Sequence, residues 1–270
     1  MTDISMVGPD GVALPGLGPI DLTAGDQGEG RPFLLLHGGG GPQTVAGFAE
    51  LLATTGPARV ITPAHPGFGG TPRPDGLASM AGLAALYREL LDRLGLHDVT
   101  VIGNSIGGWI AAELALLGSA RISGLVLVDA VGIEVEGHPV TDIFPLSMDE
   151  LARLSYFNPA AFRIDPAAMT EEQRAGMAAN RAALAVYGGA RMADPGLRAR
   201  LAAIACPTLV IWGEADRIVD PDYGRAYAAG IPGARFELLP GTGHLPQLET
   251  PEQLMRAVWD FAGAVLSHRE

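Results

Sequence analysis

The chain has 270 residues, of which 48% are hydrophobic and 18% are charged, and its net charge is −12. This composition predicts a globular protein with one large core, or a core with a small subdomain. The acidic charge and the lack of any run of Lys or Arg exclude nucleic acid as an expected partner. The single cysteine, Cys206, excludes an intrachain disulfide and fits a reducing compartment, so we expect a cytoplasmic location. We expect no signal peptide, and no apolar run approaches the ~18 residues that span a bilayer, so we expect no membrane association.

Short apolar runs alternate with amphipathic stretches along most of the chain. A hairpin is expected at Ile4–Leu14, around Pro9-Asp10-Gly11. Buried strands are expected at Pro32–His37, Arg59–Thr62, Val99–Ile102, Gly124–Asp129, Thr208–Trp212 and Arg235–Leu239. Helices are expected at Val45–Thr55, Leu77–Leu94, from Ile106 onward, and at about Pro251–Leu266. This alternation predicts an α/β fold, with a mostly parallel central sheet flanked by helices.

Residues 132–203 interrupt the alternation. They hold no clear strand, but they do hold helical stretches at 148–154, 171–184 and 195–201. We expect a helical cap subdomain here, inserted after the sixth strand, with residues 1–131 and 204–270 forming the core domain. A cap over the C-terminal edge of the sheet would roof a pocket and shape what enters it.

Ser105 lies between glycines where a strand pattern changes to a helical one. A strand-to-helix turn this tight forces its central residue towards positive φ, and Gly103 and Gly107 keep the surrounding space empty. Ser105 would then stand at a helix N-terminus, which favours developing negative charge and suits a nucleophile. The alternative is a serine N-cap on a helix that packs closely against the sheet.

A serine nucleophile needs a base, and the base needs an acid to orient it. Among the histidines, His37, His65 and His244 lie at the expected C-terminal edge of the sheet, where open α/β sheets place their ligands. We expect no catalytic role for the others, which are His97 in a solvent-facing turn, His138 in a loop of the cap and His268 in the C-terminal tail. Asp216 follows one predicted strand and Asp129 ends another, so both are candidates for the acid.

The glycine run His37–Pro42 follows the first apolar strand. Its backbone N–H groups can bend over the turn at Ser105 and, with the N–H of Ile106, form an oxyanion hole. The run has neither the Lys-Ser/Thr of a P-loop nor the spacing of a dinucleotide site. The histidines also lack metal-ligand spacing. We therefore expect no cofactor and no metal.

Five motifs, in this order, resemble those of the α/β-hydrolase superfamily. They are HGGGGP at 37–42, PGFGGT at 66–71, GNSIGG at 103–108, GEADRIV at 213–219 and GTGHLPQLE at 241–249. The resemblance covers roughly residues 31–265. It implies an α/β-hydrolase fold, a catalytic triad and an oxyanion hole. The implied residues are Ser105, His244 and Asp216 for the triad, Gly39 and Ile106 for the oxyanion hole, and His37 in a structural role.

Two departures from the superfamily pattern affect these expectations. Many members have an Asp where Ala64 and His65 stand, and we expect only a small local change in loop bonding there. Ser105 itself argues against epoxide hydrolysis and haloalkane dehalogenation, because those members carry an Asp at this turn.

The resemblance implies cleavage of a small-molecule substrate, and the apolar residues near the expected pocket favour a small or medium hydrophobic carboxylic ester. The pocket residues we expect are Trp109, Phe144, Met148 and Leu245. One alternative is a carbon–carbon bond hydrolase that acts on ring-fission products of aromatic degradation. Those enzymes typically carry a Trp soon after the catalytic His, where this chain has Leu245, and they need a cation. The cap arginines that could supply it are Arg163, Arg174, Arg181 and Arg191.

Another alternative, from a different functional class, is a ligand-binding or receptor protein that retains the triad. The complete set of motifs favours an enzyme, although a receptor can have the same motifs in its sequence. Slow single-turnover chemistry with tight ligand retention would distinguish the receptor. The oligomeric state does not follow from the sequence.

Overall fold

The computed structural model describes residues 2–6, 11–14, 17–165 and 167–267. Among these residues, eight strands form one sheet in the order β1-β4-β6-β5-β7-β8-β9-β10. The strands are β1 (Thr2–Met6), β4 (Leu22–Gly28), β5 (Arg31–Leu36), β6 (Ala58–Pro63), β7 (Val99–Asn104), β8 (Ile122–Val128), β9 (Thr208–Gly213) and β10 (Arg235–Leu239). From β6 to β10 in this order every neighbouring pair is parallel. β4 runs antiparallel to β6, and β1 runs antiparallel to β4. The predicted mostly parallel sheet is confirmed.

The first strands differ from the predicted hairpin. β1 pairs with β4, whereas β2 (Val12–Leu14) pairs with β3 (Leu17–Ile20) in a separate two-stranded sheet. A search for apolar runs misses β4 because its sequence, LTAGDQG, is polar and only partly buried. This strand nevertheless lies between β1 and β6 and so takes the place of the expected hairpin partner. Residues 7–10, which hold most of the predicted turn, lie outside the described residues.

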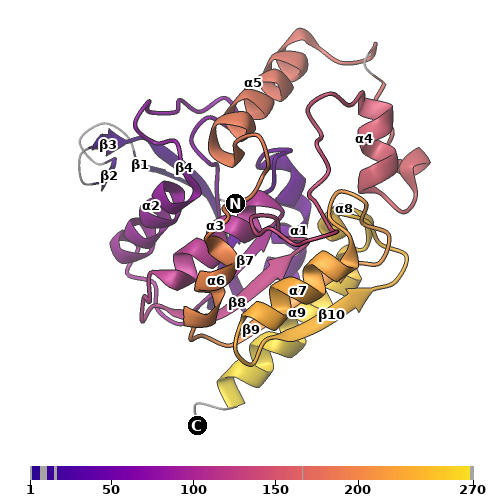
Figure 1. Ribbon diagram of the computed structural model, residues 1–270. Coiled ribbons are helices and arrows are strands. Elements are labelled where there is room, and N and C mark those ends of the chain that lie inside the picture. The colour runs from indigo at the N-terminus through magenta and orange to yellow at the C-terminus, as the bar shows by residue number, and fades with distance from the viewer. Residues whose placement is uncertain (1, 7–10, 15–16, 166, 268–270) are drawn as a thin grey trace.

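Helices cover both faces of the sheet (Figure 1). They are α1 (Gln43–Thr55), α2 (Met80–Arg93), α3 (Ile106–Leu116), α7 (Pro221–Gly230), α8 (Pro246–Glu249) and α9 (Pro251–Ser267). Phe33 and Leu35 of β5 pack into the core cluster that holds α1 and α9, whereas Leu34 and Leu36 pack into the one that holds α2 and α3. Successive side chains of a strand point to opposite faces, so a strand buried on both faces is apolar throughout.

No helix within the described residues has both the length and the apolar character needed to cross a membrane.

The segment between β8 and β9 leaves the sheet and is helical. It contains α4 (Met148–Ser155), α5 (Glu171–Gly188), α6 (Leu197–Arg200) and the 3-10 helices Pro159–Phe162 and Leu201–Ala203. It follows β8, the sixth strand of the large sheet in chain order. Figure 1 shows α4 and α5 at the end of the molecule opposite the C-terminus, whereas α6 lies beside α3 and α7. The domain boundaries at 131 and 204 remain a prediction.

Replacing glycine by alanine is expected to have opposite effects on stability at Gly103 and at Gly47. A Cβ at Gly103 would lie 2.1 Å from the carbonyl oxygen of Gly107, so Gly103→Ala is expected to destabilise the fold by at least about 1–3 kcal/mol. Gly47 is exposed within α1, and a Cβ there would meet nothing within 4 Å. Gly47→Ala is therefore expected to stabilise the fold by about 0.5–1 kcal/mol. Urea unfolding measures both changes, and equal midpoints for the two variants would contradict this account.

Candidate active site

Ser105 stands in the tight turn between β7 and α3. Its backbone has φ 55° and ψ −118°, a conformation that residues with a side chain rarely adopt. Its N–H donates to the carbonyl of Val128 at 3.0 Å, and its own carbonyl accepts from the N–H of Gly108 at 3.0 Å. A Cβ at Gly107 would lie 2.3 Å from the carbonyl oxygen of Leu36, so β5 approaches α3 through bare backbone. These contacts fix the strained turn that presents the serine.

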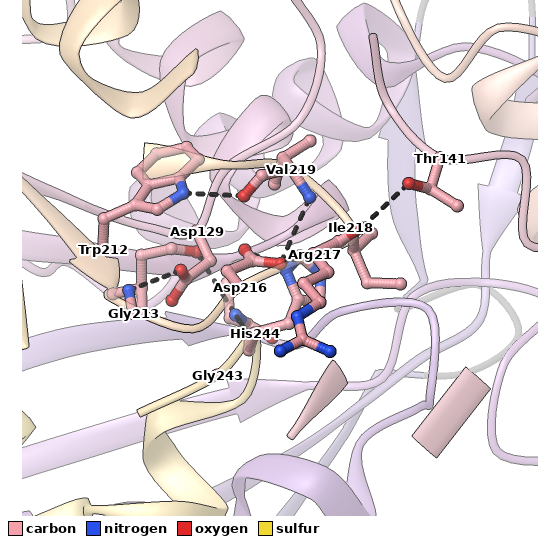
Figure 2. A network of polar contacts seen from close by, with 12 residues as sticks. Asp129, Thr141, Trp212, Gly213, Asp216, Arg217, Ile218, Val219, Gly243 and His244 are labelled. Atoms are coloured by element: carbon pink, nitrogen blue, oxygen red, sulfur yellow. Dashed lines mark hydrogen bonds and ion pairs between the residues drawn. The ribbon is translucent and has the colours of Figure 1, made fainter. Parts of the chain in front are cut away.

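His244 and Asp216 form a buried pair beside this turn (Figure 2). The Nδ1 atom of His244 lies 2.7 Å from Oδ2 of Asp216. The other carboxylate oxygen of Asp216 accepts the N–H groups of Ile218 at 2.8 Å and Val219 at 3.1 Å. These bonds fix the orientation of the carboxylate, so Nδ1 of His244 carries the proton and Nε2 is left as an acceptor.

Asp129, the rival acid, takes a different partner. Its Oδ1 accepts the N–H of Gly213 at 2.8 Å, and its Oδ2 is buried with no hydrogen-bond partner among the described residues. Burial and the neighbouring Asp216 raise the pKa of the Asp129 carboxyl well above its usual range. The structure therefore joins His244 to Asp216 and not to Asp129.

The expected oxyanion donors lie on two sides of Ser105. Ile106 is the first residue of α3, so its N–H has no acceptor within the helix. Gly39 lines the same cavity as Ser105. The amide of Asn180, on α5, holds the glycine run, because its Nδ2 donates to the carbonyl of Gly40 at 3.0 Å. Its Oδ1 accepts the N–H of Gly69 at 2.9 Å.

A cavity of about 390 Å³ lies over Ser105 and His244. The helical segment contributes a mainly apolar wall. The apolar side chains of this segment that line the cavity are Val140, Ile143, Met148, Leu151, Ala152, Phe162, Ile164, Met177, Ala178, Leu184 and Met192. Such a wall favours apolar groups on the substrate.

Two of the four expected pocket residues line this cavity and two do not. Met148 and Leu245 lie in its wall. Trp109 does not, because its position one turn into α3 places its ring in the core. There the indole packs so closely on Gly132 that a Cβ on this glycine would lie only 2.5 Å from the ring. Phe144 also lies outside the cavity wall, with the guanidinium of Arg181 5.6 Å above its ring centre. Neither Trp109 nor Phe144 is among the described residues that line this cavity.

Arg181 is the one arginine among the described cavity-lining residues. Its guanidinium donates to the carbonyl of Ile143 at 3.0 Å and to that of Phe144. The other cap arginines have partners of their own: Arg163 with Asp149, Arg174 with the carbonyl of Met169, and Arg191 with Glu134.

Comparison with known proteins identifies the family. The sequence profile of the alpha/beta hydrolase family matches residues 33–257. The chain belongs to the alpha/beta hydrolase family. A 2-hydroxymuconate semialdehyde hydrolase from Pseudomonas putida is 31% identical, covering 92% of this chain and 94% of that protein. A 2-hydroxy-6-oxo-6-phenylhexa-2,4-dienoate hydrolase from Burkholderia cepacia is 28% identical, covering 91% and 92%.

Among solved structures, a thermophilic esterase from Thermogutta terrifontis with malate bound is similar to this chain. Its TM-score is 0.74 at 26% identity, and the match covers 98% of this chain and 99% of that one. Together the matches support a hydrolase activity for this member of the family. These relatives are named for the cleavage of different bonds.

Beneath the glycine run of this hydrolase, two histidines stack with 3.7 Å between ring centroids. His37 Nε2 accepts the N–H of His65 at 3.1 Å, so its Nδ1 donates to the carbonyl of Gly38 at 2.7 Å. His65 Nε2 donates to the carbonyl of His37 at 2.9 Å, and its Nδ1 accepts from the hydroxyl of Tyr87. Burial lowers the pKa of His37 to about 4 and that of His65 well below its usual range, so both rings are neutral. At His65, where many family members have an Asp, we expected only a small local change in loop bonding. The hydrogen bonds of His65 are more extensive than that expectation.

Several polar residues that hold the site were missed in the sequence. The side chain of Asn104 donates to the carbonyl of His244 at 3.0 Å and accepts from Gln247 at 3.0 Å. The carboxylate of Glu249 accepts the N–H of Gly243 at 2.7 Å and those of residues 157–158, just beyond α4, at 3.1 and 2.8 Å. Asn104 precedes the serine directly, and Gln247 and Glu249 follow the histidine within one motif. Their positions within these motifs are the sequence signal that could have indicated a supporting role.

The buried histidine pair predicts a loss of stability in acid. The pKa of His37 is about 4 in the fold against 6.5 in the unfolded chain, so the unfolded state binds more protons below pH 6.5. The free energy of unfolding is therefore expected to fall between pH 6.5 and about 4, by on the order of 3 kcal/mol for His37 alone. Urea unfolding at a series of pH values measures this dependence.

The matched controls are two glutamine variants. His37→Gln is expected to weaken the pH dependence, whereas His97→Gln, at an exposed position, is expected to leave it as in the wild type. The same pH dependence in all three proteins would contradict a role for His37.

Proposed function

We propose that this chain is a serine hydrolase that cleaves small or medium hydrophobic carboxylic esters. The observation that carries the proposal is the cavity, whose wall over Ser105 is mainly apolar and whose arginine, Arg181, is bound by backbone carbonyls of the cap. A neutral apolar acyl or alcohol group gains free energy when it is buried there. A substrate carboxylate would lose its hydration beside a guanidinium whose Nη2 already donates to two cap carbonyls.

The proposed reaction uses Ser105 as nucleophile, His244 as base and Asp216 as the acid that orients the base. Nε2 of His244 takes the proton of Ser105 as the Oγ attacks the carbonyl carbon, and the N–H groups of Gly39 and Ile106 bind the oxyanion. Asp216 holds the imidazolium that forms. His244 gives the proton to the leaving alcohol, which departs and leaves an acyl-enzyme. Water then attacks the acyl-enzyme with His244 as base, which releases the acid and restores Ser105.

Hydrolysis of a carbon–carbon bond is the second candidate. It is favoured by the 31% identity to the 2-hydroxymuconate semialdehyde hydrolase of Pseudomonas putida, which spans 92% of this chain. The same nucleophile, base and oxyanion donors would serve it. It ranks second because its acidic substrate would need the engaged Arg181, and because Leu245 gives an aliphatic side chain directly after His244. We keep a cytoplasmic location as part of the proposal, on the single free cysteine.

Removal of the nucleophile is the decisive test. Ser105→Ala is expected to lower kcat for p-nitrophenyl esters by at least about 10³-fold, because the acyl-enzyme can no longer form. The series from acetate to decanoate, measured with wild type and variant side by side, gives the preferred chain length. Ser119→Ala, outside the cavity wall, is the matched control and is expected to keep the wild-type rate.

Three outcomes would contradict the proposal in different ways. Equal rates for wild type and Ser105→Ala would remove Ser105 as the nucleophile. Turnover of a 2-hydroxy-6-oxodienoate with no turnover of any ester would establish the second candidate. A single turnover with tight retention of the ligand would indicate a triad-retaining binding protein.

A further inference from the structure

Two buried carboxyl groups meet at the one histidine of the site. Asp129 follows β8 and Asp216 follows β9, and these strands are parallel neighbours, so their carboxyl ends lie at the same edge of the sheet. One carboxylate oxygen of each residue and one ring nitrogen of His244 all lie within 4.8 Å of one another. All three side chains are buried (Figure 2). The hydrolytic mechanism uses only one of these two carboxyls.

Asp129 is held firmly in this position. Its backbone has φ 47°, a left-handed conformation that is uncommon for a residue with a side chain. Its N–H donates to the carbonyl of Ile211 at 3.0 Å, and its Oδ1 accepts from Gly213 at 2.8 Å. Its Oδ2 has no acceptor or donor among the described residues, although it is fully buried. A buried carboxyl oxygen without a partner is rare and requires an explanation.

A proton on Asp129 supplies that explanation. Two adjacent buried carboxylates repel each other, so the pair retains one proton. Asp216 accepts two backbone N–H groups and His244, whereas Asp129 accepts one N–H group. The better-solvated anion is therefore Asp216, and the proton belongs to Asp129. In that form the orphaned oxygen becomes a donor that faces Asp216.

The charged surroundings agree with this assignment. The titratable groups that approach Asp129 are Asp216 from the loop after β9 and His244 from the loop after β10. The adjacent strand β7 ends in the uncharged Asn104 and Ser105. The negative charge of Asp216 and burial both raise the pKa of Asp129.

We propose that Asp129 is a neutral carboxylic acid that positions Asp216 in the resting enzyme and serves as a reserve partner for His244. The proposal rests on the proposed serine-hydrolase function. When the Asp216 carboxylate is replaced by an amide, Asp129 releases its proton to solvent. The carboxylate of Asp129 then accepts the N–H of His244 Nδ1. The O–H of the Asp129 carboxyl is the only covalent bond that breaks. Asp129 is thus a positioning residue that acts through His244.

The test is a double-mutant cycle followed across pH. The proteins are wild type, Asp129→Asn, Asp216→Asn, the double variant, and Asp222→Asn as an exposed control. Asp129→Asn is expected to lower kcat only three- to tenfold, roughly, and the loss stays small because the amide still accepts from Gly213 and still donates to Asp216. Asp216→Asn is expected to retain about 10²-fold more activity than the double variant, whose loss should be about 10⁴-fold. Asp222→Asn should match the wild type.

The pH profile separates a reserve acid from a merely structural residue. The residual rate of Asp216→Asn is expected to rise with pH, with an apparent pKa above that of the wild type, because Asp129 must first ionise. In the double variant this upward displacement of the apparent pKa should disappear. If the double variant fails to fold, the profile of Asp216→Asn alone decides, since an apparent pKa above that of the wild type supports the proposal and an apparent pKa equal to it or below it overturns the proposal.

Labelling of Ser105 by a fluorophosphonate keeps this test independent of the substrate. If the wild type hydrolyses no ester but is labelled, the proposed ester hydrolysis fails and the labelling rates of the same variants still test Asp129. Equal labelling of Asp216→Asn and the double variant at every pH would overturn the role of Asp129, whatever the substrate is.

Discussion

The close backbone approach around Ser105 is the constraint on which the site depends. The turn at this residue leaves no space for a Cβ at Gly103 or Gly107, because carbonyl oxygens lie 2.1 and 2.3 Å from where those atoms would be. A second close approach lies next to it, since a Cβ at Gly213 would be 2.0 Å from the carbonyl oxygen of Gly243. At the first point β7, α3 and the end of β5 therefore meet through main chain, and at the second β9 meets the histidine loop through main chain. Their relative positions depend on backbone geometry, which is stiffer than contacts between long side chains.

The helical segment holds two parts of the site and does more than cover it. At the end of α4, the carbonyl of Ser155 accepts the N–H of His244 at 2.7 Å, and Glu249 joins the same loop to the residues beyond α4. On α5, Asn180 binds the carbonyl of Gly40 in the glycine run. A rigid movement of the whole segment away from the sheet would break bonds to both the base and the oxyanion loop. Substrate entry that preserves the site must therefore leave these two attachments in place.

The elements that could be predicted from the sequence are those with a repeating pattern or a fixed motif. Buried strands are apolar throughout, and Ser105 and Asp216 each follow such a strand, so their place at one sheet edge follows from the parallel order. The strand β4 was missed because a partly exposed strand such as LTAGDQG has no apolar run. Trp109 was misplaced because α3 is buried on every side, and helical spacing does not tell which side faces the cavity. The contacts of Asn180 have no signal in the sequence, because one polar residue in a helix gains its role only from tertiary packing.

Ester hydrolysis and carbon–carbon bond hydrolysis differ in what must happen to the leaving group. Attack of Ser105 on a carbonyl and capture of the oxyanion are common to both reactions, so the turn and the triad do not discriminate between them. An alkoxide leaving group needs only the proton that His244 has just taken. A carbon leaving group needs its negative charge delocalised and held, for which a guanidinium in the cavity is the suitable group. Arg181 lines this cavity, and its Nη2 donates to the carbonyls of Ile143 and Phe144, so that nitrogen helps to hold the cap.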